Sequence, residues 1–195
     1  MPGSTVNSHL TIGVTIGVGG YTSPLTIEPV TFSGGPPNPP TIAGGDISAT
    51  NPGGAGVYSN LLNASIQNQG IVYGAPGAPF IATSTAGNGV DLFGGGTLNN
   101  GDTGRIGGGR ATSGAGSGVS LSSSTLFNNG AIYGGYYGGT GVAATNSYDL
   151  NTSQISGGRK GAVTSAVGVV LTNSTLINQG TVSAGYPAGF AAAGL

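Results

Sequence analysis

The feature that most constrains the fold of this chain is an internal repeat that aligns without a gap. Residues 118–132 match residues 168–182, and both copies begin with Gly-Val, continue through a Ser/Thr-rich stretch and end near Asn-x-Gly. A looser copy begins at Gly56, and degenerate copies begin at Gly89 and Gly141. A constant pattern at irregular spacing indicates one structural unit interrupted by loops of different length, as in solenoids.

Each unit has the pattern of two or three short strands separated by bends. The apolar positions are separated by Ser, Thr and Asn-x-Gly, and Gly and Asn take positive φ in bends at low cost. Helices are not expected, because the chain has 42 glycines in 195 residues and each interior Gly costs a helix about 1 kcal/mol relative to Ala. We therefore predict an all-β, single-domain parallel β-helix (β-solenoid) with irregular loop insertions.

Stacking these units in register predicts two columns of side chains. The apolar column, a stacking core, consists of Ile66, Leu126 and Leu176. The polar column consists of Asn68, Asn128 and Asn178, and we expect their amides to form a ladder along the axis, as stacked Asn side chains do.

The sequence divides into three parts. Residues 1–20 are expected to form an N-terminal strand that is available for exchange between subunits, residues 21–55 the first turns with a Pro-rich loop, and residues 56–195 the β-helix repeats. Apolar residues alternate strictly with Thr or Gly from Leu10 to Val18, which predicts a single strand with one aliphatic face. The alternative is that this strand is the first rung of its own helix.

A family resemblance rests on one motif. The stretch Leu126-Phe127-Asn128-Asn129-Gly130-Ala131-Ile132-Tyr133-Gly134-Gly135 has the pattern L-x-N-x-G-x-I-x-G-G, and residues 176–182 repeat part of it. This pattern resembles the β-helical passenger repeats of bacterial autotransporter-type surface proteins, over roughly residues 56–185. The resemblance implies the β-helix fold, and a surface adhesin is the function that it brings into consideration.

Charge and titratable residues exclude several functions. With 4 Lys+Arg, 5 Asp+Glu and a net charge of −1, the chain lacks the cations that a nucleic-acid partner requires. No apolar run reaches the length of a transmembrane helix, so membrane insertion is not expected. Only Asp91 and Asp102 share a repeat unit, near Arg105 and Arg110, and the single histidine, His9, is expected to be solvated. We therefore expect neither enzymatic activity nor a cofactor or metal site.

Both ends of the expected helix are apolar and uncapped, which predicts assembly. A head-to-tail contact that does not close gives an open polymer, so we expect a structural protein that self-assembles end to end into filaments, either cytoskeleton-like or as an extracellular fibre. The residues expected to mediate this assembly are Leu10, Ile12, Val14, Ile16, Val18, Phe190 and Leu195.

The alternative function is a surface adhesin-type β-helix that binds glycans or a host protein through its loops. Tyr133, Tyr136 and Tyr137 would then stack on sugar rings, although glycan binding is the weaker of the two expectations. The first residues contain no Lys or Arg and no long apolar run, so they do not read as a secretory signal. We expect a cytoplasmic location if Met1 is the native start, and a cell-surface or extracellular location if a leader was removed.

Overall fold

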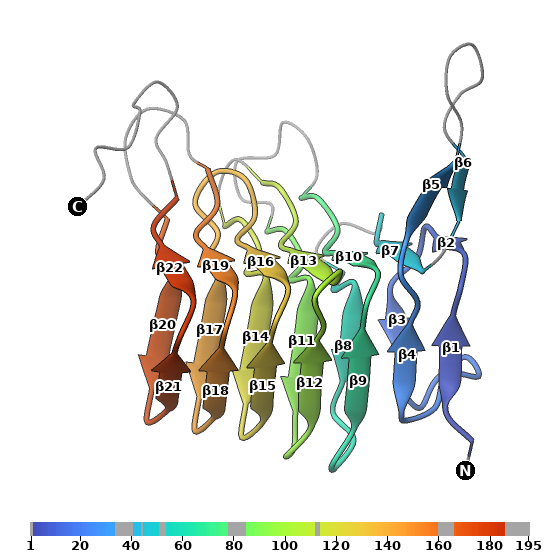
Figure 1. Ribbon diagram of the computed structural model, residues 1–195, viewed down its shortest axis with the longest axis horizontal. Coiled ribbons are helices and arrows are strands. Elements are labelled where there is room, and N and C mark those ends of the chain that lie inside the picture. Colours follow the sequence, from blue (N-terminus) through green and yellow to red (C-terminus); the bar gives the residue numbers. More distant parts are fainter. Residues whose placement is uncertain are drawn as a thin grey trace.

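The computed structural model describes residues 2–33, 41–43, 45–50, 54–77, 85–111, 114–159 and 166–185. Within these residues every regular element is a strand, and the strands form three parallel sheets plus one antiparallel hairpin. The strands stack along one long axis, with β1 at one end of the stack and β20, β21 and β22 at the other (Figure 1). The predicted parallel β-helix is confirmed.

The chain visits the three sheets in a fixed order, A then B then C, and its last described strand lies in sheet B, so that sheets A and B have seven strands each and sheet C has six. Sheet A consists of β1 (Ser4–Val6), β4 (Leu25–Ile27), β9 (Ser65–Asn68), β12 (Thr97–Asn100), β15 (Thr125–Asn128), β18 (Tyr148–Asn151) and β21 (Thr175–Asn178). Sheet B consists of β2 (His9–Leu10), β7 (Asp46–Ser48), β10 (Ile71–Tyr73), β13 (Arg105–Gly107), β16 (Ala131–Tyr133), β19 (Gln154–Ser156) and β22 (Thr181–Ser183). Sheet C consists of β3 (Val14–Thr15), β8 (Val57–Ser59), β11 (Val90–Phe93), β14 (Val119–Ser122), β17 (Val142–Thr145) and β20 (Val169–Thr172).

Two groups of strands define the ends of the solenoid. The N-terminal rung is formed by β1, β2 and β3, and the C-terminal rung by β20, β21 and β22. The hairpin of β5 (Thr31–Ser33) and β6 (Thr41–Ala43) is an excursion between β4 and β7 that projects from the body (Figure 1).

The Gly-Val pairs of the repeat start the strands of sheet C, and close approach between rungs explains their glycines. A Cβ added at Gly56, Gly89, Gly118 or Gly141 would lie between 2.4 and 2.7 Å from the carbonyl oxygen of the next glycine in this column. Only glycine permits such an approach. The valine that follows each of these glycines is buried in the core.

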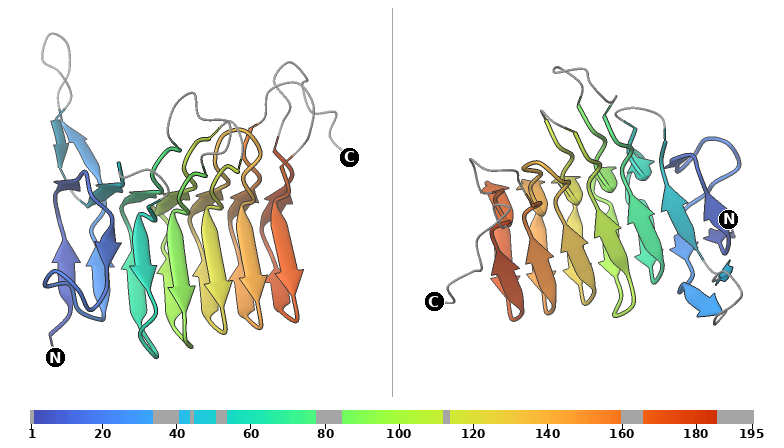
Figure 2. Two further views of the ribbon diagram at one scale, coloured as in Figure 1. Left: turned by 180° about the vertical axis from the view of Figure 1, so that it is seen from behind. Right: turned by 90° about the horizontal axis from the view of Figure 1, so that it is seen from above.

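The long loops between sheets B and C leave the body through a seam of hydrogen-bonded glycines. The Gly109 N–H donates to the Gly87 carbonyl at 2.8 Å, and the Gly135 N–H donates to the Gly116 carbonyl at 2.7 Å. A Cβ at Gly158 would lie 1.8 Å from the Gly135 carbonyl oxygen. The seam therefore accounts for part of the high glycine content, and the loops that it anchors emerge along one edge of the stack (Figure 2).

The core consists of columns of aliphatic side chains inside the rungs. Residues that are paired between strands share a column, because strands in register keep the same alternation of inward and outward side chains. The column of sheet B is completely buried from the second rung to the sixth and contains Ile47, Val72, Ile106, Ile132 and Ile155.

Candidate functional site

An asparagine ladder runs along the ends of the strands of sheet A. The side-chain amide of each of the first four members donates to the amide oxygen of the next member at 2.7–2.8 Å, and the members are Asn68, Asn100, Asn128, Asn151 and Asn178. The first four are no more than 1% exposed, whereas Asn178 in the C-terminal rung is exposed. Backbone N–H groups of the following turn also donate to ladder members, as Gly70 does to Asn68 at 3.2 Å.

The structure places all three asparagines of the predicted polar column in this ladder. Asn100 and Asn151 were missed, because their repeat units are degenerate and align only at Gly-Val. A local pattern could have identified both residues, because every repeat unit carries Asn at the last position of its sheet A strand.

The three residues of the predicted stacking core lie in one inward column of sheet A. By strand register the column contains Ile66, Leu98, Leu126, Asp149 and Leu176. Ile66 and Leu126 are completely buried, and Leu176 in the C-terminal rung is half-buried. A carboxylate therefore occupies one place in a column that is otherwise aliphatic.

Asp149 is the most unusual side chain of the core. It is 0% exposed, and neither of its carboxylate oxygens has a hydrogen-bond partner among the described residues. Burial raises the pKa of Asp149 from its usual 3.8 to about 6, because an ionised carboxylate is poorly stabilised in apolar surroundings. The adjacent Leu150 faces outward, in register with Phe127 and Ile177.

The N-terminal segment differs from the predicted single strand. Residues 10–18 are divided between β2 and β3, and their aliphatic side chains do not share one face: Val14 and Ile16 are 1% exposed, whereas Ile12 is 57% and Val18 64% exposed. Glycine is the physical reason. Gly17 has a φ of 94° and lies in a turn, so the alternating pattern continues through bends that a strand does not contain.

These strands form the first rung of the chain's own helix, which was the alternative expectation. β1, β2 and β3 pair in parallel with β4, β7 and β8 respectively.

The prediction of an uncapped N-terminal end is wrong. Of the inward side chains of the N-terminal rung, Val6 and Val14 are only 3% and 1% exposed and Leu10 is half-buried. The connection from β3 to β4 returns past β1: the Thr22 N–H donates to Ser4 Oγ at 2.8 Å, the Thr22 hydroxyl donates to the Pro2 carbonyl at 2.9 Å, and Tyr21 packs against the core.

The C-terminal rung, by contrast, is open. Its inward side chains Leu171 and Val182 are 39% and 37% exposed, although the residues paired with them in the preceding rung, Ala144 and Ile155, are buried. Among the described residues no strand lies beyond β20, β21 and β22 in the three sheets. Phe190 and Leu195, the other residues expected to mediate assembly, lie outside the described residues.

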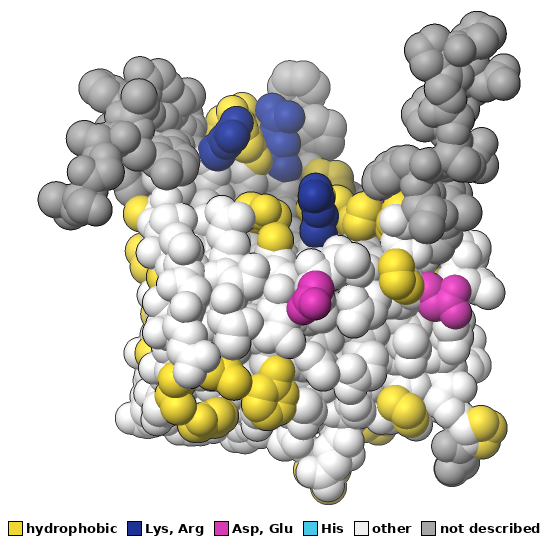
Figure 3. Space-filling view, viewed as in Figure 1, with side chains coloured by type: hydrophobic (Ala, Val, Ile, Leu, Met, Phe, Trp, Pro, Cys, Tyr) yellow, Lys and Arg dark blue, Asp and Glu magenta, His cyan; other side chains and the backbone are white. Residues whose placement is uncertain are grey.

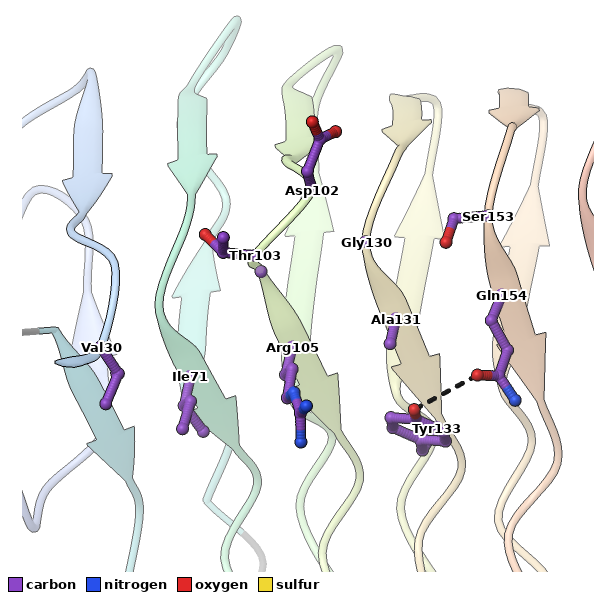
Figure 4. Close-up of a pocket in the computed structure, with 11 residues that line it drawn as sticks. Val30, Ile71, Asp102, Thr103, Arg105, Gly130, Ala131, Tyr133, Ser153 and Gln154 are labelled. Carbon is purple, nitrogen blue, oxygen red and sulfur yellow. Dashed lines mark hydrogen bonds between the residues drawn. The ribbon is translucent and has the colours of Figure 1, made fainter. Parts of the chain in front are cut away.

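Tyrosines and arginines gather on the outer face of sheet B and on the loops beside it. A hollow of about 470 Å³ is lined by Arg105, Tyr133 and Gln154 among others, and the Tyr133 hydroxyl lies 3.3 Å from Gln154 Oε1 (Figure 4). A second hollow of about 460 Å³ shares Tyr133 and Gln154 and extends to Tyr136 and Arg159. The arginine side chains, dark blue in Figure 3, lie toward the edge that carries the loops.

Arg110 organises the two loop tyrosines. Its guanidinium lies 5.1 Å from the ring centroid of Tyr136 and 5.2 Å from that of Tyr137, and it donates to the Tyr137 hydroxyl at 3.2 Å. The two rings meet edge to face at 4.6 Å. The cluster has the geometry of cation–π packing, which holds the rings in place.

The two acidic residues that share a repeat unit lie on different segments of the rung. Asp91 lies on sheet C, where Asn88 Nδ2 donates to it at 2.6 Å, whereas Asp102 lies in the turn between sheets A and B. Burial raises the pKa of Asp91, and hydrogen bonds from Asn88 and Ser120 oppose that effect. His9 is not simply solvated, because its Nδ1 lies 3.0 Å from Asp46 Oδ2. Across the described residues no three His, Cys, Asp or Glu side chains are grouped so that they could hold a metal ion.

No family model, curated protein or solved structure matches the chain. The resemblance to autotransporter-type passenger repeats therefore remains a hypothesis. The part of the chain that the structure describes contains no helix long and apolar enough to cross a membrane.

Proposed function

We propose that this chain is a structural β-solenoid that associates with other copies of itself through its C-terminal rung. The observation that carries the proposal is the exposure of inward-facing apolar side chains at this end, while the equivalent side chains of the inner rungs are buried. Another rung placed on this end would bury them and would pair the free edges of three strands.

The asparagine ladder also favours association through the C-terminal rung. Asn178 accepts from Asn151 at 2.7 Å, and its own Nδ2 donates to the Gly180 carbonyl at 3.2 Å instead of to a further asparagine. A second copy stacked on β21 would offer it a new acceptor.

The two ends of the solenoid are not alike, which decides between two forms of assembly. Contact between two C-terminal rungs about a two-fold axis gives a closed pair, whereas contact of one C-terminal rung with the covered N-terminal end of the next copy gives a filament. In the second arrangement the register of sheet A would place Asn178 over Val6, which offers no hydrogen-bond partner to the amide. The paired form is therefore the one we favour, and end-to-end filaments are the alternative.

Sedimentation velocity with negative-stain microscopy tests this proposal. Leu171→Asp places a charge on an inward position of the open rung and is expected to abolish association. Val170→Asp, on the neighbouring outward position, serves as the matched control and is expected to leave association unchanged. Wild-type protein that stays monomeric at high concentration, or equal effects of the two substitutions, would overturn the proposal. Pairs of solenoids joined end to end would distinguish the closed form from filaments.

A second candidate function rests on the face of sheet B. Two adjoining hollows that share Tyr133 and Gln154, with arginines along them, offer aromatic faces and planar donors on a shallow surface, which suits a glycan lying across several rungs. A peptide would fit less well, because a sheet face offers no free backbone edge. Affinity electrophoresis in gels containing an acidic or a neutral polysaccharide tests this, with Tyr136→Ala expected to remove any retardation; wild-type protein that is not retarded would dismiss the candidate.

A further inference from the structure

The position of Asp149 allows the charge of one side chain to affect how firmly the C-terminal rung is docked on the solenoid. Asp149 is fully buried without a hydrogen-bond partner among the described residues, and the rung directly beyond it is the open C-terminal rung. We propose that protonation of Asp149 docks the C-terminal rung onto the solenoid and that ionisation of Asp149 loosens this rung, so that the end of the molecule responds to pH.

Among the described residues no charged group near Asp149 compensates for its ionisation, and burial is the cause of its raised pKa. Its neighbours in sheet A are β15 and β21, and the strands across the core are β16, β17, β19, β20 and β22. On these strands and on β18 itself, the other titratable side chains are Tyr133 and Tyr148, and both are at outward positions. An ionised Asp149 can therefore be stabilised only by water, which has to enter the core.

The C-terminal side is the one that can admit water. On the N-terminal side, Leu126 and Ile132 are 0% exposed and lie beneath a continuous stack of rungs. On the C-terminal side only one rung covers the carboxylate, and its inward Leu171 is 39% exposed. Loosening β20, β21 and β22 breaks the pairing on one side of a single rung, whereas opening the stack elsewhere separates two parts of the body.

The direction of the effect follows from the burial of the carboxyl group. Because the pKa of Asp149 is raised to about 6, the buried group is protonated in mildly acidic solution and the rung stays docked. Above that pH the ionised form favours the loosened state, in which water reaches the carboxylate. With an ordinary pKa in the loosened state, opening should increase about tenfold between about pH 5 and about pH 7.5.

The proposed self-association through the C-terminal rung would depend on pH in the same way, because it requires this rung to be docked. That consequence rests on the proposed function, and it predicts stronger association at about pH 5 than at about pH 7.5. The docking of the rung within one molecule does not depend on association and can be measured separately.

Hydrogen exchange read by mass spectrometry tests the docking of the rung. After correction for intrinsic exchange rates, peptides covering β20 to β22 of the wild-type protein should lose about tenfold in protection from about pH 5 to about pH 7.5. Asp149→Asn and Asp149→Leu should remove this change, and Leu is the residue found at the equivalent position of four other rungs. Asp91→Asn, which alters a carboxylate on the outside of sheet C, is the control and should retain it.

Equal protection of the wild-type rung at both pH values would overturn the proposal, as would an unchanged pH dependence in both Asp149 variants. Sedimentation velocity on the same samples separates this result from the proposed function. If copies do not associate at either pH while protection still depends on Asp149, then the self-association is refuted and the docking of the rung is supported.

Discussion

Replacing Asn128 with Ala tests how much the asparagine ladder contributes to stability. Asn128 is 0% exposed, accepts from Asn100 Nδ2 at 2.7 Å and donates to Asn151 Oδ1 at 2.7 Å. The substitution removes both of these bonds and a longer one, from Asn128 Nδ2 to the Gln154 carbonyl at 3.3 Å. It leaves a buried donor on Asn100 without its partner, and Asn151 Oδ1 retains only the bond from the Ser153 N–H at 3.3 Å.

The expected loss of stability is the sum of the effects on the Asn100 donor and on the Asn151 acceptor. A buried donor left without a partner costs roughly 1–3 kcal/mol, and the loss of a bond whose acceptor keeps another partner costs about 1 kcal/mol. We therefore expect Asn128→Ala to lower the free energy of unfolding by roughly 2–4 kcal/mol. For a chain of this size each kcal/mol corresponds to a shift of about 2–4 °C in Tm.

Asn178→Ala is the matched control, because Asn178 belongs to the same ladder but is exposed and bonds to an asparagine on one side only. Asn151 Nδ2 loses its bond to Asn178 but keeps its bond to the Ser153 carbonyl at 3.1 Å, and water can reach the exposed site, so the expected cost is about 1 kcal/mol. Thermal unfolding followed by circular dichroism measures both variants. Equal losses of stability would refute the reasoning, because they would show that burial in the ladder adds nothing to an ordinary surface hydrogen bond.

Three further predictions follow from the packing and the charges. Gly158→Ala should cost more than about 3 kcal/mol of stability, because the added Cβ would clash with the backbone carbonyl of Gly135. A variant that melts like the wild-type protein would contradict the close packing of glycines in the seam. Leu126→Asp should abolish folding at neutral pH, because it places a second carboxylate beside Asp149, about 4.8 Å away across the strand pair; unchanged circular dichroism and melting would contradict this register. In denaturant titrations, the stability difference between wild type and Asp149→Asn should shift against wild type by about 2.4 kcal/mol as pH rises from about 4 to about 7, since the native state holds the proton more tightly than the unfolded state; a difference that is flat with pH would contradict the burial of the charge.

Assembly of the wild-type protein should depend little on salt. With 4 Lys+Arg and 5 Asp+Glu in 195 residues, apolar burial and backbone pairing must dominate over ion pairing. Dissociation on raising NaCl from low to molar concentration, followed by sedimentation, would show that charges hold the copies together.

The repeat predicted the body of the fold well, because its physical cause is local. In the units that begin at Gly56, Gly89, Gly118 and Gly141 the glycine is required by contact with the next rung and the valine after it is buried, and the last unit carries the same two residues. The degenerate unit at Gly141 could be recognised by these two residues alone. The column positions within that unit could not, because its sheet A strand carries Asp149 where the other units carry Leu or Ile.

The N-terminal segment shows why an alternating pattern is not sufficient to define a strand. Val14 and Ile16 are both inward, as alternation requires, but the chain bends on either side of them. A Cβ at Gly13 would lie 2.2 Å from the Ala55 carbonyl oxygen, and this contact forms only when the next rung is in place. Such a tertiary constraint leaves no mark in the hydrophobic pattern of the segment itself.

Asp149 has to be judged against the other polar side chains of the core, which are all satisfied. The buried ladder asparagines bond to one another, Ser124 Oγ donates to the Ser122 carbonyl at 2.9 Å, and Ser147 Oγ donates to the Thr145 carbonyl at 2.8 Å. Asp149 alone among the described residues has buried side-chain oxygens without partners. A chain that satisfies its core so consistently departs from the pattern at one place, and departures of this kind concentrate at functional sites. The departure lies one rung from the open end, where a cost in stability can act on the end of the molecule and leave the rest of the stack intact.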